Sequence, residues 1–233
     1  MIREFFGFSW IFGFLTVVSV GDGFARSTAQ ERTGSPERVR IANDRKGLIL
    51  ERSGSPFRPR GFNYDHDERG RLLEDYWETE WPKVVEDFRE MRALGANVVR
   101  IHLQVGKFLK SPKESDAGAL DRLGMLVSLA EETGLHLDLT GLGCYRKADV
   151  PAWYDELDEA GRWAAQATFW EAVAGRCAGS PAIFCYDLMN EPVVPGGRRK
   201  EGDWLGPPFG GYCYVHFITL DQGTRPRPEI ARA

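Results

Sequence analysis

Short apolar runs alternate with longer amphipathic stretches through the middle of the chain. The apolar runs have the length of strands, and the stretches between them repeat apolar residues at helical spacing. Four strands are predicted, at residues 60–64, 97–103, 136–142 and 182–189. Three helices are predicted between them, at residues 81–94, 119–133 and 161–178. This alternation is typical of βα units around a parallel sheet, so the pattern predicts an α/β fold.

Proline and glycine mark the ends of the predicted helices. Pro82 lies near the start of the first helix, and Gly95 and Gly134 follow the last apolar turns of the first and second. These are the positions that each residue type favours at helix ends. Strands begin almost immediately after both glycines, and such short connections occur in barrels and in doubly wound sheets alike. The pattern alone does not separate those two architectures.

The predicted βα units are flanked by less regular segments. Apolar runs at 39–42 and 48–52 surround a polar turn, which predicts a short β-hairpin ahead of the main fold. Beyond Pro192 the chain is rich in glycine and proline, and residues 212–220 then look strand-like. The apolar run 214–220 fits either a fifth strand or an ordered part of a long loop, and we favour the loop.

The first residues have the pattern of an export signal. Arg3 precedes an uncharged apolar stretch over 5–20, which small residues follow. The stretch is shorter than the roughly 20 apolar residues that cross a bilayer, so cleavage is favoured over an uncleaved anchor. We therefore expect a signal peptide at 1–25, a polar linker at 26–38 and one domain at 39–233. The mature protein would be secreted or periplasmic, with no stable membrane span.

Charge and composition exclude several classes of function. The formal net charge is −4, so the chain has no overall basic field to attract nucleic acid. The cysteines and histidines show no CxxC or HExxH spacing, and we expect no metal and no other cofactor. The four cysteines allow three disulfide pairings, which the sequence leaves open. No GxGxxG or GxSxG motif supports a doubly wound hydrolase.

The strongest chemical signal is YDLMNEP at residues 186–192. Here an apolar strand presents Asn190 and Glu191 at its carboxyl end, where a parallel α/β barrel places its active site. Desolvation near an apolar strand favours the protonated form of a carboxyl group, which suits a proton donor. The alternative is a surface carboxylate at a strand end. The position after the fourth predicted strand favours a catalytic origin.

Polar side chains elsewhere are candidates for the same site. Arg100 and His102 alternate with apolar residues in VVRIH, so they share one face of a strand. An inward arginine needs an anionic partner. The alternative for Arg100 is a position at a surface strand end, and the alternative for His102 is a structural role. Trp153 and Trp204 lie in loop-like segments and are candidate stacking surfaces for a sugar ring.

Three blocks, in their order along the chain, resemble the clan A glycoside hydrolases and most closely family 5, which contains cellulases and mannanases. They are RGFNYD at 60–65, NVVRIHL at 97–103 and FWEAVAGRCAGSPAIFCYDLMNEP at 169–192. The resemblance implies a (β/α)8 TIM barrel with Glu191 as general acid/base. It also implies that Asn190 contacts the 2-hydroxyl of the substrate and that Arg100 supports the nucleophile. We take Tyr64 and His102 as further candidate substrate contacts.

The implied activity is retaining hydrolysis of a β-linked polysaccharide, a glucan or a mannan. In the resembling family the nucleophile is a glutamate on the seventh strand. Only Glu201 and Glu229 follow the motif here, and neither ends an apolar strand. We therefore expect the N-terminal half of a barrel, truncated after four strands, with little activity alone and with open edges that permit self-association. The alternative is a non-catalytic carbohydrate-binding or interaction protein on a partial hydrolase scaffold.

Overall fold

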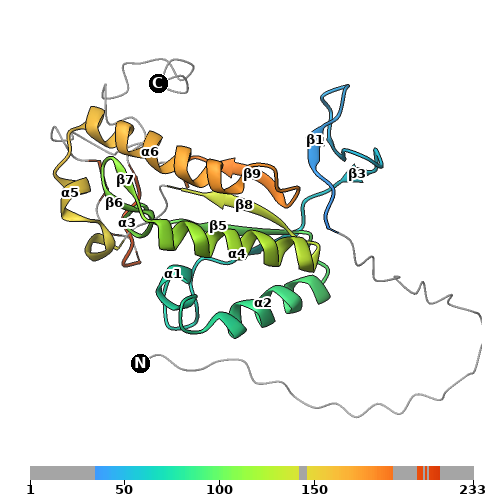
Figure 1. Cartoon of the computed structure of the whole chain (residues 1–233), viewed down its shortest axis with the longest axis horizontal. Helices are drawn as coiled ribbons and strands as arrows, with labels where there is room; N and C mark the ends of the chain where they lie inside the picture. The colour runs from blue at the N-terminus through green and yellow to red at the C-terminus, as the bar shows by residue number, and fades with distance from the viewer. Residues whose placement is uncertain (1–34, 142–145, 191–203, 207, 209, 216–233) are drawn as a thin grey trace, which may run out of the picture. The chain divides into compact units, whose positions relative to one another are not determined.

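A computed structural model describes residues 35–141, 146–190, 204–206, 208 and 210–215. Its central sheet has four parallel strands in the order β4-β5-β8-β9 (Figure 1). The strands are β4 (Gly61–Asn63), β5 (Val98–His102), β8 (His136–Thr140) and β9 (Ile183–Asp187). Helices α2 (Trp81–Ala93), α4 (Ala117–Thr133) and α6 (Glu159–Cys177) lie between consecutive strands in the sequence. The α/β prediction is confirmed, and among the described residues the sheet does not close.

The predicted hairpin is present and has a third strand that the sequence did not indicate. Strands β1 (Val39–Ile41), β2 (Leu48–Leu50) and β3 (Pro56–Phe57) form an antiparallel sheet. The remaining short elements were also not predicted. They are α1 (Leu73–Tyr76), α3 (Val105–Phe108), β6 (Leu109–Ser111), β7 (Glu114–Ser115), the 3-10 helix Lys147–Asp149 and α5 (Ala152–Asp155).

The long helices begin and end where local chemistry favours it. The Asp116 side chain accepts a hydrogen bond from the Ala119 N–H at the start of α4, and Asp158 does the same for Gly161 in α6. Gly134 ends α4 with φ of 70°, a left-handed conformation that costs glycine little. The sequence placed the boundaries of these helices to within about two residues, as is usual for helix ends.

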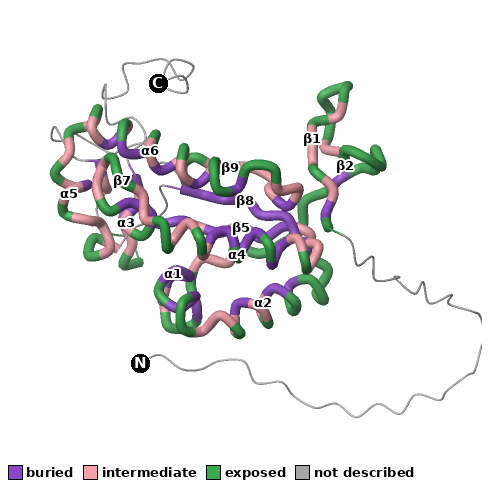
Figure 2. The backbone as a smooth tube through the Cα atoms, viewed as in Figure 1, coloured by how far each residue is buried: buried purple, intermediate pink, exposed green. Residues whose placement is uncertain are grey.

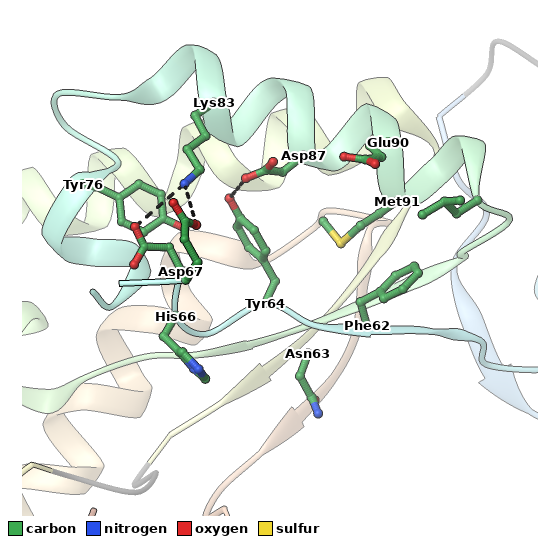
Figure 3. A pocket seen from close by; sticks show the side chains of 12 residues that line it. Phe62, Asn63, Tyr64, His66, Asp67, Tyr76, Lys83, Asp87, Glu90 and Met91 are labelled. Atoms are coloured by element: carbon green, nitrogen blue, oxygen red, sulfur yellow. Dashed lines mark hydrogen bonds and ion pairs between the residues drawn. The ribbon is translucent and has the colours of Figure 1, made fainter. Parts of the chain in front are cut away.

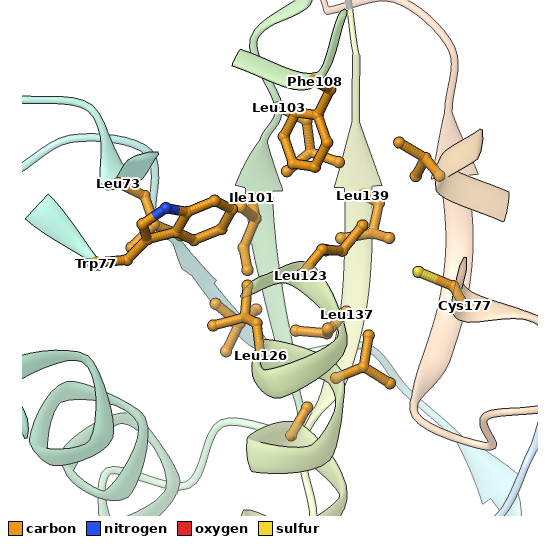
Figure 4. Close-up of a cluster of buried hydrophobic side chains, with 14 of the residues drawn as sticks. Leu73, Trp77, Ile101, Leu103, Phe108, Leu123, Leu126, Leu137, Leu139 and Cys177 are labelled. Atoms are coloured by element: carbon orange, nitrogen blue, oxygen red, sulfur yellow. The ribbon is translucent and has the colours of Figure 1, made fainter. Parts of the chain in front are cut away.

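The core lies between the sheet and its helices (Figure 4). Ile101 on β5 and Leu137 and Leu139 on β8 are fully buried, and Leu123 and Leu126 of α4 pack against them. These strand residues alternate with polar ones, so the apolar side chains share the face that the helices cover. The polar side chains of β5 and β8 consequently share the other face.

The small antiparallel sheet is attached at the amino ends of the parallel strands. His136, the first residue of β8, contacts the Glu37 carbonyl through Nε2 at 2.8 Å, and its ring packs edge-on against Phe57. Asn97, just before β5, donates from Nδ2 to the Arg58 carbonyl and accepts from the Arg60 N–H. The small sheet therefore lies at the opposite ends of the strands from the predicted site residue Asn190.

Residues near the end of the chain are only partly described. Val215 forms an isolated antiparallel bridge with Leu205, and residues 216–220 of the predicted strand or loop lie outside the described residues. None of the helices in the described part of the chain has the length and apolar character needed to cross a membrane.

Candidate active site

The polar face of the sheet is built by strand alternation. Arg100 pairs in register with Asp138, and Thr140 pairs with both His102 and Asp187. Because β5, β8 and β9 are adjacent and parallel, their polar side chains meet toward the same carboxyl edge. In a closed barrel this would be the inner face, which leads to the mouth where catalytic groups lie.

Arg100 links β5 to β9 across this face. Its Nη2 donates to Asp187 Oδ2 at 2.6 Å and to Asn190 Oδ1 at 2.8 Å. Arg100 stands on β5, so its guanidinium reaches across β8 to β9. The anionic partner that the sequence required is therefore Asp187, and the same nitrogen orients the amide of Asn190.

Asn190 is fixed by further contacts. It is 3% exposed, and its N–H donates to the Gly141 carbonyl at 3.2 Å. The amide side chain is thereby held at the carboxyl end of β9, directly before Glu191. Glu191 itself lies outside the described residues.

A second carboxylate, Asp138, stands beside Arg100. Its Oδ2 is 3.6 Å from Arg100 Nε, and its Oδ1 is buried without a hydrogen-bond partner among the described residues. Burial raises the pKa of Asp138, while a hydrogen bond with Cys185 and the charge of Arg100 lower it. The contacts with Arg100 and Cys185 stabilise the ionised carboxylate of Asp138, but they do not fully offset the effect of its burial.

His102 also lies on the polar face, on the side nearer β4. Its Nδ1 is 3.5 Å from Asp65 Oδ2, and the other oxygen of Asp65 is 3.0 Å from His66 Nδ1. The side chain of His102 is 11% exposed. The structure therefore brings His102 to the same face as Arg100, with a carboxylate to orient its ring.

Tyr64, a candidate substrate contact from the sequence, points away from this face (Figure 3). Its hydroxyl donates to Asp87 Oδ2 of α2 at 2.5 Å, and its ring packs edge-on against Phe88. Burial, and the hydrogen bond to Asp87, raise the pKa of Tyr64 far above its ordinary value. Tyr64 instead lines a pocket of about 330 Å³ between β4 and α2, with Tyr76 and Lys83 (Figure 3). Its outward direction follows from strand alternation, because Asn63 takes the other side.

The two candidate tryptophans belong to a packed cluster. Trp204 is 6% exposed, donates from Nε1 to Asp155 Oδ1 at 3.0 Å and packs edge-on against Tyr154. Trp153 is half-buried and also packs against Tyr154, which is 1% exposed. Burial leaves Trp204 little free ring surface, which argues against a stacking role in this arrangement. Trp153 retains some exposed surface.

Asp138 and Asp187 were not among the site residues predicted from the sequence. Both were visible as polar residues alternating with apolar ones inside predicted strands, in HLDLT and FCYDLM. A polar residue that alternates with apolar ones in a strand is as informative as Arg100, because a partly buried arginine needs an anionic partner on the same face. That signal could have identified both.

Comparison with known proteins places these residues in a family. The model of Cellulase (glycosyl hydrolase family 5) matches residues 50–204. A search of curated proteins finds no match. Among solved structures, the chain is similar to a β-1,4-mannanase from the sea hare Aplysia kurodai, with 16% identity, a TM-score of 0.52, and coverage of 68% of this chain and 48% of that one.

Two further structures are similar. One is the exo-β-1,4-mannosidase Op5Man5 from Opitutaceae bacterium strain TAV5, with 20% identity, a TM-score of 0.51, and coverage of 69% of this chain and 27% of that one. The other is a GH5_18 protein from Bifidobacterium longum subsp. infantis, with 22% identity, a TM-score of 0.49, and coverage of 57% and 34%. The chain thus spans between about a quarter and a half of the length of these proteins.

The two structural likenesses above a TM-score of 0.5 concern the fold, and the four parallel strands with their helices correspond to part of a (β/α)8 barrel. The family model covers well over half of the 233 residues, including Arg100, Asp187 and Asn190. The chain belongs to glycosyl hydrolase family 5.

Proposed function

We propose that this chain carries the acid/base side of a retaining glycosidase active site that acts on a β-linked glucan or mannan. The observation that carries the proposal is the contact of Arg100 with Asn190 at 2.8 Å, which fixes the residue next to Glu191 at the carboxyl end of β9. Family membership supports the reaction class. The names of two structural neighbours, a mannanase and a mannosidase, favour mannan.

In this proposal each residue of the polar face has a role. Glu191 gives its proton to the glycosidic oxygen and then removes a proton from the attacking water. Asn190 donates to the hydroxyl beside the anomeric carbon. Arg100, held by Asp187, supplies positive charge next to the second carboxylate, and His102 is a candidate contact for the sugar.

Retaining hydrolysis needs a second carboxyl group about 5 to 5.5 Å from the first. Neither Glu201 nor Glu229 follows an apolar run of strand length, and both lie outside the described residues. Asp187 and Asp138 are engaged with Arg100. We therefore propose that this chain alone does not turn over substrate, because no second glutamate follows an apolar run of strand length after the motif.

The test is hydrolysis of β-mannan and of aryl β-glycosides by the purified, folded chain beside Glu191→Gln, with Glu201→Gln as a matched control. We expect no more product from the wild type than from Glu191→Gln. A wild-type rate that Glu191→Gln abolishes and Glu201→Gln preserves would overturn the proposal that this chain alone lacks a nucleophile. It would mean that a nucleophile is present in this chain or is supplied across an oligomer.

We also propose that the chain self-associates through the outer strands of its parallel sheet. Among the described residues β4 and β9 each have one unpaired edge, and Phe62 and Tyr186 on them are 42% and 37% exposed. Unpaired edges with exposed apolar side chains favour association. Light scattering over a range of concentrations tests this; a monomer at all concentrations contradicts it.

A further inference from the structure

The antiparallel sheet at the amino ends of the barrel strands carries a local charge opposite to that of the chain. Residues 35–60 contain seven basic and three acidic side chains, a net charge of +4, whereas the whole chain has −4. The remainder from residue 61 onward contains twenty basic and twenty-eight acidic side chains. This segment is therefore a strongly basic part of an acidic domain.

Four of these cations form what we call the basic hairpin surface: Arg45, Lys46, Arg58 and Arg60. All four are exposed, and in the described part of the chain none of their side chains makes a hydrogen bond or ion pair. The loop that bears Arg45 and Lys46 joins β1 to β2 and is exposed (Figure 2). Surface cations without partners are available for a ligand.

Sheet register places Lys46 and Arg58 at the same end of the small sheet, while Arg45 adjoins Lys46 in the turn and Arg60 follows Arg58 by two residues. Leu48 pairs with Phe57, so Gly47 and Arg58 lie one position beyond that pair, next to Lys46. The side chain of Asn97 holds the backbone of this stretch at two points, the Arg58 carbonyl at 2.9 Å and the Arg60 N–H at 2.7 Å. Pro59 further restricts the backbone between them. The two guanidinium groups consequently start from a fixed backbone, which lowers the entropy cost of binding.

The nearby acids do not neutralise this surface. Glu37 accepts hydrogen bonds from the N–H groups of Arg52 and Ser53, and Asp44 accepts one from the N–H of Lys46. The Asp44 contact is a local turn contact, whereas Glu37 binds the backbone of a turn that lies about fifteen residues further along the chain. The basic hairpin surface lies at the amino ends of the strands, whereas Asp187 and Asn190 lie at the carboxyl end of β9, so the two can be occupied at once.

We propose that the basic hairpin surface binds a polysaccharide that bears carboxylate groups, and that it anchors the domain while the polar face at the other end of the strands is free for a neutral β-glycan. Guanidinium groups match carboxylates through paired hydrogen bonds. The choice of a polysaccharide rests on the proposed function. Nucleic acid fits less well, because Phe57, the only aromatic residue of the segment, is 8% exposed and offers no base a stacking surface.

The experiment measures binding of the intact chain to polygalacturonate, with neutral galactomannan and an oligonucleotide as comparison ligands, at low and high salt. Arg58→Ser/Arg60→Ser should weaken binding to polygalacturonate about tenfold, since each exposed pair contributes little alone. The matched control is Arg89→Ser/Lys113→Ser, which removes the same charge from two exposed positions outside the segment and should leave binding unchanged.

A second double variant tests the same surface at positions where the substitutions should not disturb folding. Arg45→Asn/Lys46→Ser changes an exposed turn, and asparagine suits the positive φ of Arg45. It should weaken binding as the first pair does. Equal weakening by the control pair, or no weakening by either hairpin pair, overturns the proposal, and an equally tight oligonucleotide overturns the choice of partner. Binding of neutral mannotetraose should be unchanged in all these variants, so a failure of this inference is distinguishable from a failure of the proposed glycosidase site.

Discussion

Arg100 on β5 and Asp187 on β9 are joined at 2.6 Å across the intervening strand β8. The same Nη2 atom of Arg100 reaches Asn190 at 2.8 Å. Asp187 therefore sets where the guanidinium lies, and the guanidinium sets where the amide of Asn190 lies. The residue beside the proposed acid/base is held by a charge pair between strands 87 positions apart in the sequence.

Replacing Asp187 should disturb this arrangement without unfolding the domain. In Asp187→Asn the charge-assisted hydrogen bond becomes an ordinary one. We expect a loss of about 1 kcal/mol in the free energy of unfolding, because the carboxylate is 36% exposed and solvent screens the pair. Urea unfolding measures it.

Asp138→Asn is the matched comparison on the neighbouring strand. The Asp138 carboxylate is 3.6 Å from Arg100 Nε, and burial raises its pKa, so the ionised form is poorly stabilised in the fold. We expect a smaller loss of stability than in Asp187→Asn, or a gain, at neutral pH. A larger loss of stability in Asp138→Asn would mean that Asp138, and not Asp187, is the main partner of Arg100.

Glu74 in α1 predicts a pH dependence of stability. Burial raises its pKa from an ordinary 4.5 to about 7, against the hydrogen bond from the Gln104 N–H at 2.8 Å, which lowers it. Its other oxygen, Oε2, has no hydrogen-bond partner among the described residues. The folded state therefore holds a proton between pH 4.5 and 7 that the unfolded state has released. This contribution to stability is complete below pH 4.5 and is lost as the pH rises through 7, by roughly 3 kcal/mol in all.

Glu74→Gln should remove this dependence. Glutamine keeps an oxygen for the Gln104 N–H and carries no charge, so the variant should be more stable than the wild type at pH 8 by about 2 kcal/mol and similar to it at pH 4.5. Unfolding curves across this range measure the difference. Glu86→Gln, at an exposed position, is the control; a wild type with the same pH profile as Glu74→Gln would contradict the assignment.

Two glycines should respond oppositely to alanine. A Cβ at Gly61 would lie deep inside the contact distance of the Val98 carbonyl oxygen, a backbone atom in the paired strand, whereas at Gly175 in α6 nothing lies within 4 Å. Gly61→Ala should destabilise the domain by roughly 3 kcal/mol or more. Gly175→Ala should stabilise it by about 0.5–1 kcal/mol through helix propensity. Thermal unfolding of both variants checks the pair, and equal effects would contradict the close approach of β4 to β5.

The sequence predicted the long elements well because periodicity and end signals agree there. Pro82 and Gly134 are examples, since each lies where a helix boundary needs it. Short elements such as α3 and β6 were missed because four or fewer residues carry no period. Arg100 and His102 were placed on one face correctly by strand alternation.

Tyr64 and Trp204 show what the sequence could not decide. Tyr64 follows a short strand, and its direction toward Asp87 depends on the helix that packs there. Trp204 lies in a segment without regular structure, and its burial against Tyr154 depends on contacts about fifty residues away in the sequence. Long-range packing of this kind leaves no local pattern.

The most direct test of the account is titration of the folded chain with β-1,4-mannotetraose and cellotetraose by calorimetry, beside Asn190→Ala and the control Asn43→Ala from the exposed hairpin turn. We expect saturable binding of at least one oligosaccharide, weakened about tenfold in Asn190→Ala by the loss of a hydrogen bond, and unchanged in Asn43→Ala. A folded wild type that binds neither oligosaccharide, or an Asn190→Ala variant that binds as the wild type does, would contradict a sugar site at the carboxyl end of β9.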